Sequence, residues 1–206
     1  MSVGKHFDIN ESQHRCWIRS HSQKCITRSS TFKGKRMNHD APIAVLTDRL
    51  QCLLHAECQI GFALLNLFEQ TSHTTLRELI SESMNASDRH ACKLLGVFNR
   101  LGAVPRTARS PITEMIRDCE DGPDRNAMGC LRQLMIVARF RRLQTYKLHE
   151  YEFLHHLTMG YRPPQEGAIF GELLHEEILV ARKLHHLIGD VYADFALQFT
   201  PAGLQA

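Results

Sequence analysis

Ionisable side chains interrupt apolar helical stripes at three places in this sequence of 206 residues. A helix that packs in a bundle presents one stripe of apolar residues, spaced alternately three and four apart, to its partners. In residues 43–70 this stripe is aliphatic except at Glu57, and in residues 166–197 it is apolar except at Glu177. In residues 74–101 the middle of the stripe is polar, with Ser83, Ser87 and His90.

A lone carboxylate in such a stripe costs several kcal/mol unless it is paired or binds a cation. Glutamates and histidines from facing helices are also the ligands of di-iron and di-manganese centres in bundle cores. We therefore expect Glu57, His90 and Glu177 to meet inside the protein. Two interpretations compete with a metal site: a metal-free polar layer in which Glu57 pairs with His90, or a rotated helix that turns one of these residues to solvent.

Residues 124–159 have apolar side chains around the whole helix, so the sequence leaves two registers open. One register places Arg142, His149 and Glu152 in the core, and the i, i+3 spacing of His149 and Glu152 is suitable for chelation. The other register buries a different set, namely Leu134, Val137, Phe140, Leu148 and Tyr151.

The elements that position these residues are predicted to be helices throughout. The spacing predicts four long helices over 43–70, 74–101, 124–159 and 166–197, and a short one over 111–119. Gly102 followed by Pro105 ends the second long helix, and Gly160 followed by two prolines ends the third. We expect an all-α, four-helix up-down bundle over 41–199, with the short helix in the connection between the second and third long helices.

Charge separates the first residues from the rest. Residues 1–36 hold eight basic and two acidic residues, a net charge of +6, whereas the other 17 basic and 20 acidic residues give −3. We expect residues 1–40 to be a basic, disordered arm that could contact an acidic partner, and 200–206 to be a tail. The bundle has no electrostatic reason to bind nucleic acid, and no apolar run is long enough to span a membrane.

The seven cysteines are odd in number and form no CxxC motif, so a disulfide framework is not expected. We expect reduced thiols buried as small apolar groups in a cytoplasmic protein. Hydrolase chemistry has no support, because neither a GxSxG element nor a phosphate-binding glycine loop is present. The run beginning at His149 starts like a zinc-protease HExxH helix, but Phe153 stands at the second histidine position.

Several segments together resemble a bacterial ferritin-like family, the stress-associated YciE/YciF-type proteins. The segments, in chain order, are LQCLLHAECQI (50–60), HACKLLGVFNRLG (90–102), SPITEMI around Met115, LHEYEF (148–153) and ELLHEEILVARKL (172–184). The resemblance implies a ferritin-like fold and matches five residues to the metal ligands of the family: Glu57, His90, His149, Glu152 and Glu177.

The sequence departs from the family pattern at the implied ligands. Ser83 and Ala86 stand where the family carries His and Glu, Ala181 replaces an acidic residue, and His149 replaces a glutamate. A full di-iron centre needs about four carboxylates and two histidines. The resemblance thus predicts a divergent stress-associated bundle with a degenerate di-metal site, which is not an intact ferroxidase and self-associates as a dimer. The alternative is an iron or manganese oxidase or peroxide-protection protein that uses the reduced ligand set.

Overall fold

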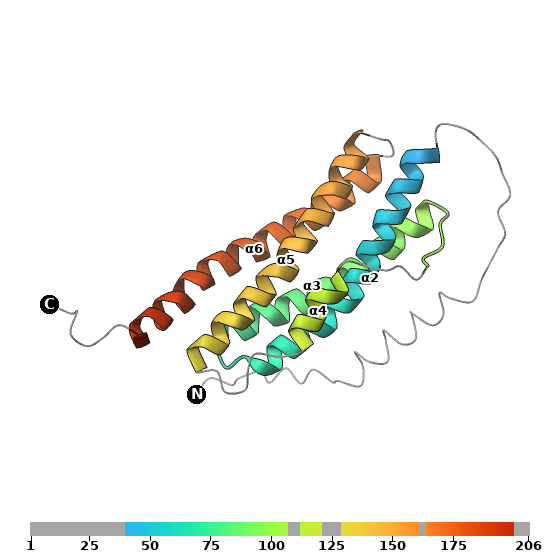
Figure 1. The fold of residues 1–206 in the computed structure, drawn as a ribbon. Helices are drawn as coiled ribbons and strands as arrows, with labels where there is room; N and C mark the ends of the chain where they lie inside the picture. The colour runs from blue at the N-terminus through green and yellow to red at the C-terminus, as the bar shows by residue number, and fades with distance from the viewer. Residues whose placement is uncertain (1–39, 107–111, 121–128, 161–163, 200–206) are drawn as a thin grey trace, which may run out of the picture.

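The computed structural model describes residues 40–106, 112–120, 129–160 and 164–199 (Figure 1). Helices are the only regular elements in these ranges, which confirms the predicted all-α class. They are α2 (Asp40–Gln70), α3 (Thr74–Arg100), α4 (Ile112–Glu120), α5 (Gly129–Gly160) and α6 (Pro164–Phe199). The predicted arm, except for residue 40 at the start of α2, and the tail from residue 200 lie outside the described residues.

The end of α3 shows how local sequence sets a helix boundary. Gly102 has a φ of +62°, a left-handed conformation that favours glycine. The Ala103 N–H donates to the Phe98 carbonyl at 3.0 Å, and the Gly102 N–H donates to Asn99 at 3.2 Å. These two bonds satisfy carbonyls that a helix end would otherwise leave unpaired. The predicted stop at Gly102 is confirmed.

The four long helices pack as two neighbouring pairs, α2 with α3 and α5 with α6 (Figure 1). Helix α2 also packs against α5, and α3 packs against α6, so the pairs close into a bundle. The short helix α4 lies against α2 and α5. The predicted four-helix bundle with a short extra helix between α3 and α5 is therefore the observed architecture.

Two apolar clusters fill the bundle, one toward each end. The first surrounds Ile60, Leu76 and Phe140, and the second surrounds Leu50, Phe98 and Phe170. The predicted stripes of α2, α3 and α6 all face this core: every member is buried except Leu101 and Val180, which are half-buried. The predicted inward faces of these three helices are therefore confirmed.

Helix α5 follows the second of its two predicted registers in part, because Leu134 and Leu148, which that register would bury, are only half-buried. Val137, Phe140 and Tyr151 are buried. Arg142 and His149, which the first register would have placed in the core, are exposed. The first register is therefore wrong, because it would have required burial of an arginine that instead pairs with Asp118 at 3.0 Å on the surface.

None of the described helices combines the length and the apolar character that a membrane span requires. The expectation of buried thiols holds for Cys119 but is wrong for Cys92, which is exposed. Cys52, Cys58 and Cys130 are half-buried and are not disulfide-bonded. Cys16 and Cys25 lie outside the described residues.

Candidate functional site

Four ionisable side chains, one from each long helix, converge between the two apolar clusters. They are Glu57 of α2, His90 of α3, Lys147 of α5 and Glu177 of α6, and we call them the central charge cluster. Each is at most 2% exposed. The sequence predicted three of these residues and missed Lys147.

The ammonium of Lys147 lies between the two carboxylates. Its Nζ is 2.6 Å from Glu177 Oε1 and 3.1 Å from Glu57 Oε2. It also donates a hydrogen bond of 3.1 Å to Ser87 Oγ. Burial would lower the pKa of Lys147, but the charges of Glu177 and Glu57 outweigh it and raise the pKa above its ordinary value. Lys147 is therefore a charged lysine in the interior.

Carboxylates surround both ring nitrogens of His90. Nδ1 is 3.1 Å from Glu177 Oε1 and 3.6 Å from Glu57 Oε1, and Nε2 is 3.0 Å from Glu176 Oε2. Burial would lower the pKa of His90, but the nearby carboxylates of Glu177 and Glu57 raise it to about 9. This environment favours the doubly protonated imidazolium.

The two carboxylates are ionised despite their burial. Burial would raise their pKa values, but Lys147 and His90 reverse the direction: the pKa of Glu57 is lowered, and that of Glu177 falls to about 2. The central charge cluster thus holds two negative and two positive charges and is neutral as a whole. This balance is what makes the burial of four ions tolerable.

Neutral side chains of α5 hold the carboxylates in place. The Tyr151 hydroxyl donates to Glu57 Oε1 at 2.6 Å, and its ring meets His90 edge-on at 5.5 Å. Gln144 Nε2 donates to both the side chain and the backbone carbonyl of Glu177, at 2.5 and 3.0 Å. Both carboxylates are therefore oriented by α5 as well as by the charges.

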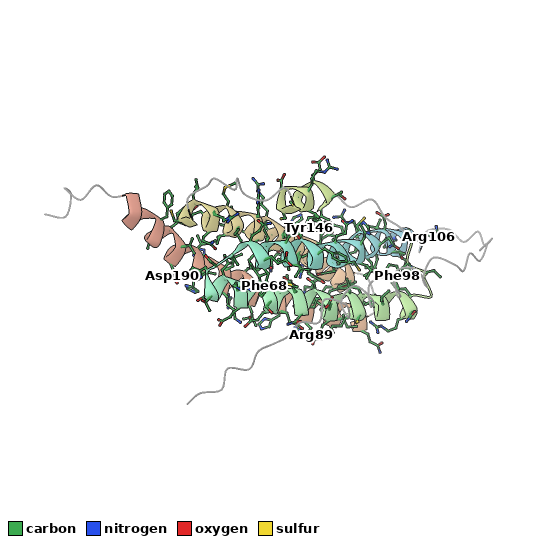
Figure 2. All side chains as sticks on the ribbon, turned by 90° about the horizontal axis from the view of Figure 1, so that it is seen from below. Phe68, Arg89, Phe98, Arg106, Tyr146 and Asp190 are labelled. Atoms are coloured by element: carbon green, nitrogen blue, oxygen red, sulfur yellow. The ribbon has the colours of Figure 1, made fainter. Side chains whose placement is uncertain are left out.

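An ion-pair network connects the cluster to the surface through Glu176. This residue is 30% exposed in its side chain, and it contacts Lys93 at 3.1 Å and Arg89 at 3.4 Å in addition to His90. Figure 2 shows Arg89 on the outer side of α3. Burial would raise the pKa of Glu176, but the contacts with His90 and Lys93 lower it to about 2. His90 is the junction between this outer network and the buried charges.

The predicted ligands divide into two groups. Glu57, His90 and Glu177 offer ligand atoms that lie within 4.8 Å of one another. His149 and Glu152 do not join them, because both are exposed on the outside of α5. The expectation that all five residues form one site is corrected accordingly.

The i, i+3 pair of α5 that faces inward is Lys147 and Glu150, two residues before the predicted pair. Glu150 does not face the central charge cluster as a ligand; its two oxygens accept hydrogen bonds from Arg49 at 2.6 and 2.8 Å. These two buried positions of the helix are therefore occupied by a lysine and by a glutamate that is already paired.

A di-metal centre does not fit these residues. Such centres take about four carboxylates and two histidines, whereas the cluster offers two carboxylates, one histidine and an ammonium. Glu57 Oε2, His90 Nδ1 and Glu177 Oε1 are buried without a directed hydrogen bond. The two oxygens instead face the Lys147 ammonium as ionic contacts, so their cation is a side chain of the protein.

A separate groove of about 450 Å³ lies between α4, α5 and α6. Apolar side chains line most of it, including Met115, Val137 and Ile188, and Arg141 and His149 contribute polar atoms. His149 lines this groove, which shares no lining residue with the central charge cluster.

The sequence pattern did not identify Lys147 or Gln144, whereas Tyr151 was expected to be buried in the second register of α5 but without its contact to Glu57. The buried positions of α5 follow the same three-and-four spacing as the other helices, through Val137, Phe140, Gln144, Lys147, Tyr151 and Leu154, but the rejected register has this spacing too, so spacing alone does not distinguish them. Charge balance gives a further signal. Two buried carboxylates require a buried cation, and α5 is the long helix that remains to supply a basic side chain.

Comparisons with known proteins agree with this architecture. Residues 42–197 match a family described as a domain of unknown function, DUF892. The stress protein YciF of E. coli has a similar structure, with a TM-score of 0.67 and 18% identity over 74% of this chain and 97% of YciF. YcfI of Rhodopseudomonas palustris, for which a structural role has been suggested, has a TM-score of 0.66 and 21% identity over 75% and 98% of the two chains. No curated protein matches the sequence.

Proposed function

This chain belongs to the DUF892 family, and from that premise we propose that it is a non-enzymatic structural bundle of the stress-associated, YciF-like type. Its central charge cluster takes the place of a di-metal centre. The single observation that carries this proposal is the Lys147 ammonium, which contacts Glu57 and Glu177 at 3.1 and 2.6 Å.

The cluster has the properties of a structural element. Its four charges cancel, and each member is at most 2% exposed, so a dissolved substrate has no direct contact with them. A catalytic metal site, by contrast, keeps a coordination position open for water or substrate. Support for the structural role also comes from YcfI, the fold neighbour for which such a role has been suggested.

The role of the cluster in this proposal is to fix which helices meet and in what register. A buried ion pair often stabilises a fold no more than apolar residues of equal volume would, so a gain in stability alone does not account for it. Each charge here comes from a different long helix. A shift of any one helix along its axis would leave an unpaired ion in the core, which is a strong penalty against misalignment.

A second candidate function is metal binding by the reduced set of Glu57, His90 and Glu177. The observation in its favour is that these three buried residues bring their ligand atoms within 4.8 Å of one another. In this alternative the chain is an iron or manganese protein with oxidase or peroxide-protection activity, and Lys147 must leave its place between the carboxylates.

Metal analysis of the purified wild-type protein separates the two functions. We expect no iron, manganese or zinc above background and no change in melting temperature when Fe²⁺ or Mn²⁺ is added. We also expect no acceleration of Fe²⁺ oxidation by oxygen over a protein-free control. One bound metal per chain, with faster Fe²⁺ oxidation, would contradict the structural proposal and support the alternative.

Self-association through the groove face is a further part of the proposal. Tyr192 of α6 lines the groove and is 57% exposed, and Leu131, three residues before the lining residue Leu134 on α5, is 41% exposed. Exposed apolar groups beside an apolar groove are typical of protein interfaces. Sedimentation should therefore show a dimer. The exchange Tyr192→Lys should shift it toward monomer, whereas Leu179→Lys, at a 44% exposed position elsewhere on α6, should not. A wild-type monomer at micromolar concentration would contradict this part.

A further inference from the structure

We infer that Lys147 closes a latent site for one divalent metal ion, formed by Glu57, His90 and Glu177, and that removing this side chain alone opens the site. The inference rests on the proposed function, because it requires that the wild-type cluster hold an ammonium in place of a metal. It goes further by assigning the exclusion of metal to one residue.

The geometry around the ammonium is that of a cation site. Glu57 Oε2 and Glu177 Oε1 contact Lys147 Nζ at 3.1 and 2.6 Å, yet neither oxygen has a directed hydrogen bond. The third ligand atom, His90 Nδ1, also lacks one and lies 3.1 Å from Glu177 Oε1. Polar atoms that are buried this completely and left without directed partners are uncommon in proteins. Here the two oxygens lie around the Lys147 ammonium.

The charge balance favours a divalent ion once the lysine is gone. The two carboxylates at present contact the nitrogen atoms of two basic side chains, Lys147 Nζ and His90 Nδ1. A histidine binds a metal as neutral imidazole. Once His90 has released a proton, two carboxylates, one neutral histidine and one divalent ion have a net charge of zero.

The ligand types narrow the choice of metal. Two carboxylate oxygens with one imidazole nitrogen suit borderline divalent ions such as Fe²⁺, Co²⁺, Mn²⁺ and Zn²⁺. The neighbours of the ligands are already in place, since Tyr151 donates to Glu57 and Gln144 donates to Glu177. Such outer hydrogen bonds orient metal ligands, so the latent site needs little rearrangement.

The test is a Co²⁺ titration of the full-length wild type and of Lys147→Ala, followed by visible absorption and by melting temperature. Alanine removes the ammonium and leaves room for a water ligand. We expect Lys147→Ala to bind one Co²⁺ per chain at least about 100-fold more tightly than the wild type. At a 100-fold excess over its Kd, Co²⁺ should raise the melting temperature of this variant by roughly 5–10 °C.

Two further variants make the result specific. Lys93→Ala removes a lysine that pairs with Glu172 and Glu176 outside the cluster, so it should bind no more Co²⁺ than the wild type. The double variant Lys147→Ala/His90→Ala should lose the gain. If Lys147→Ala does not fold alone, Lys147→Glu refolded with and without Co²⁺ replaces it, because the added carboxylate supplies a fourth ligand.

The outcomes distinguish this inference from the proposed function. A metal-free wild type together with folded Lys147 variants that bind no Co²⁺ would overturn the latent site and leave the structural function intact. Equal Co²⁺ affinity in the wild type and in Lys147→Ala would overturn the closing role of the lysine. Failure of the proposed function has its own signature, which is accelerated Fe²⁺ oxidation by the wild type.

Discussion

Two lysine–glutamate pairs in this protein have the same separation of 2.6 Å but opposite surroundings. Lys147 and Glu177 join α5 to α6 in the core, with side chains 2% and 1% exposed. Lys183 and Glu82 join α6 to α3 at the surface, with side chains 58% and 55% exposed. Water can solvate either surface partner when the other is removed, whereas a buried partner is left as an uncompensated charge. The distance between two charges therefore says little about their importance, and their burial decides it.

The largest effect is expected for Lys147→Met, which removes the buried cation while keeping most of its volume. Two carboxylates would then face a single positive charge, and such a loss costs about 3–5 kcal/mol in the free energy of unfolding. Urea denaturation in the presence of a chelator measures it. A cost below about 1 kcal/mol would mean that the buried pair behaves like the surface pair.

The next effect is a pH dependence that the surface pair does not share. The pKa of His90 rises from an ordinary value of 6.5 to about 9 in the fold, so its stabilising charge is complete below pH 6.5 and is lost as pH rises through 9. The free energy of unfolding should fall over this window by on the order of 3 kcal/mol. The ionisable groups that face His90 are Glu57, Glu176, Glu177, Lys147 and Tyr151.

The variant His90→Gln provides the control for this pH dependence. Glutamine carries no charge at any pH, so the decline between pH 6.5 and 9 should largely disappear in urea denaturation series. A decline of equal size in His90→Gln would assign the pH dependence to other groups.

A smaller effect is expected for Tyr151→Phe, which removes one neutral donor from the cluster. The hydroxyl bonds Glu57 at 2.6 Å, and a hydrogen bond to a charged group contributes about 2 kcal/mol. Thermal or urea unfolding should show a loss of that order. Tyr192→Phe, at a 57% exposed position, should leave stability unchanged, and equal losses in the two variants would argue against a specific role of the buried hydroxyl.

The smallest effect is expected for Lys183→Met. Exposed ion pairs contribute about 0.2–1 kcal/mol, and salt screens them. The change in the free energy of unfolding should therefore be at the edge of measurement and should vanish at 1 M salt. A loss comparable to that of Lys147→Met would remove the contrast between the two pairs.

Much of the fold was predictable because three helices each have one clear apolar stripe. In α2 and α6 a single carboxylate interrupts an otherwise apolar seam, so Glu57 and Glu177 stood out as buried charges. In α3 the polar middle of the stripe identified His90 in the same way. The spacing of three and four residues shows which face of a helix points to the core. Glu57, His90 and Glu177 are all buried in the structure.

The part that could not be predicted lies on α5. Its apolar residues surround the helix, because α4, α2 and α6 all pack against it, so no single stripe marks the inward face. The resemblance then matched His149 and Glu152, whereas the structure turns Lys147 and Glu150 inward. A lysine in that seam has a long stem that can be covered by apolar neighbours, and only tertiary contacts show where its ammonium ends.

A decisive measurement is the identity of the cation between Glu57 and Glu177, because we propose that it is the Lys147 ammonium and not a metal ion. Crystals of the wild-type protein grown with Zn²⁺ and measured at the zinc absorption edge would locate any metal by anomalous scattering. We expect no anomalous peak in the central charge cluster, and we expect Lys147 Nζ to lie within hydrogen-bonding distance of both carboxylates. An anomalous peak bound by Glu57, His90 and Glu177, with the Lys147 side chain turned away, would contradict it.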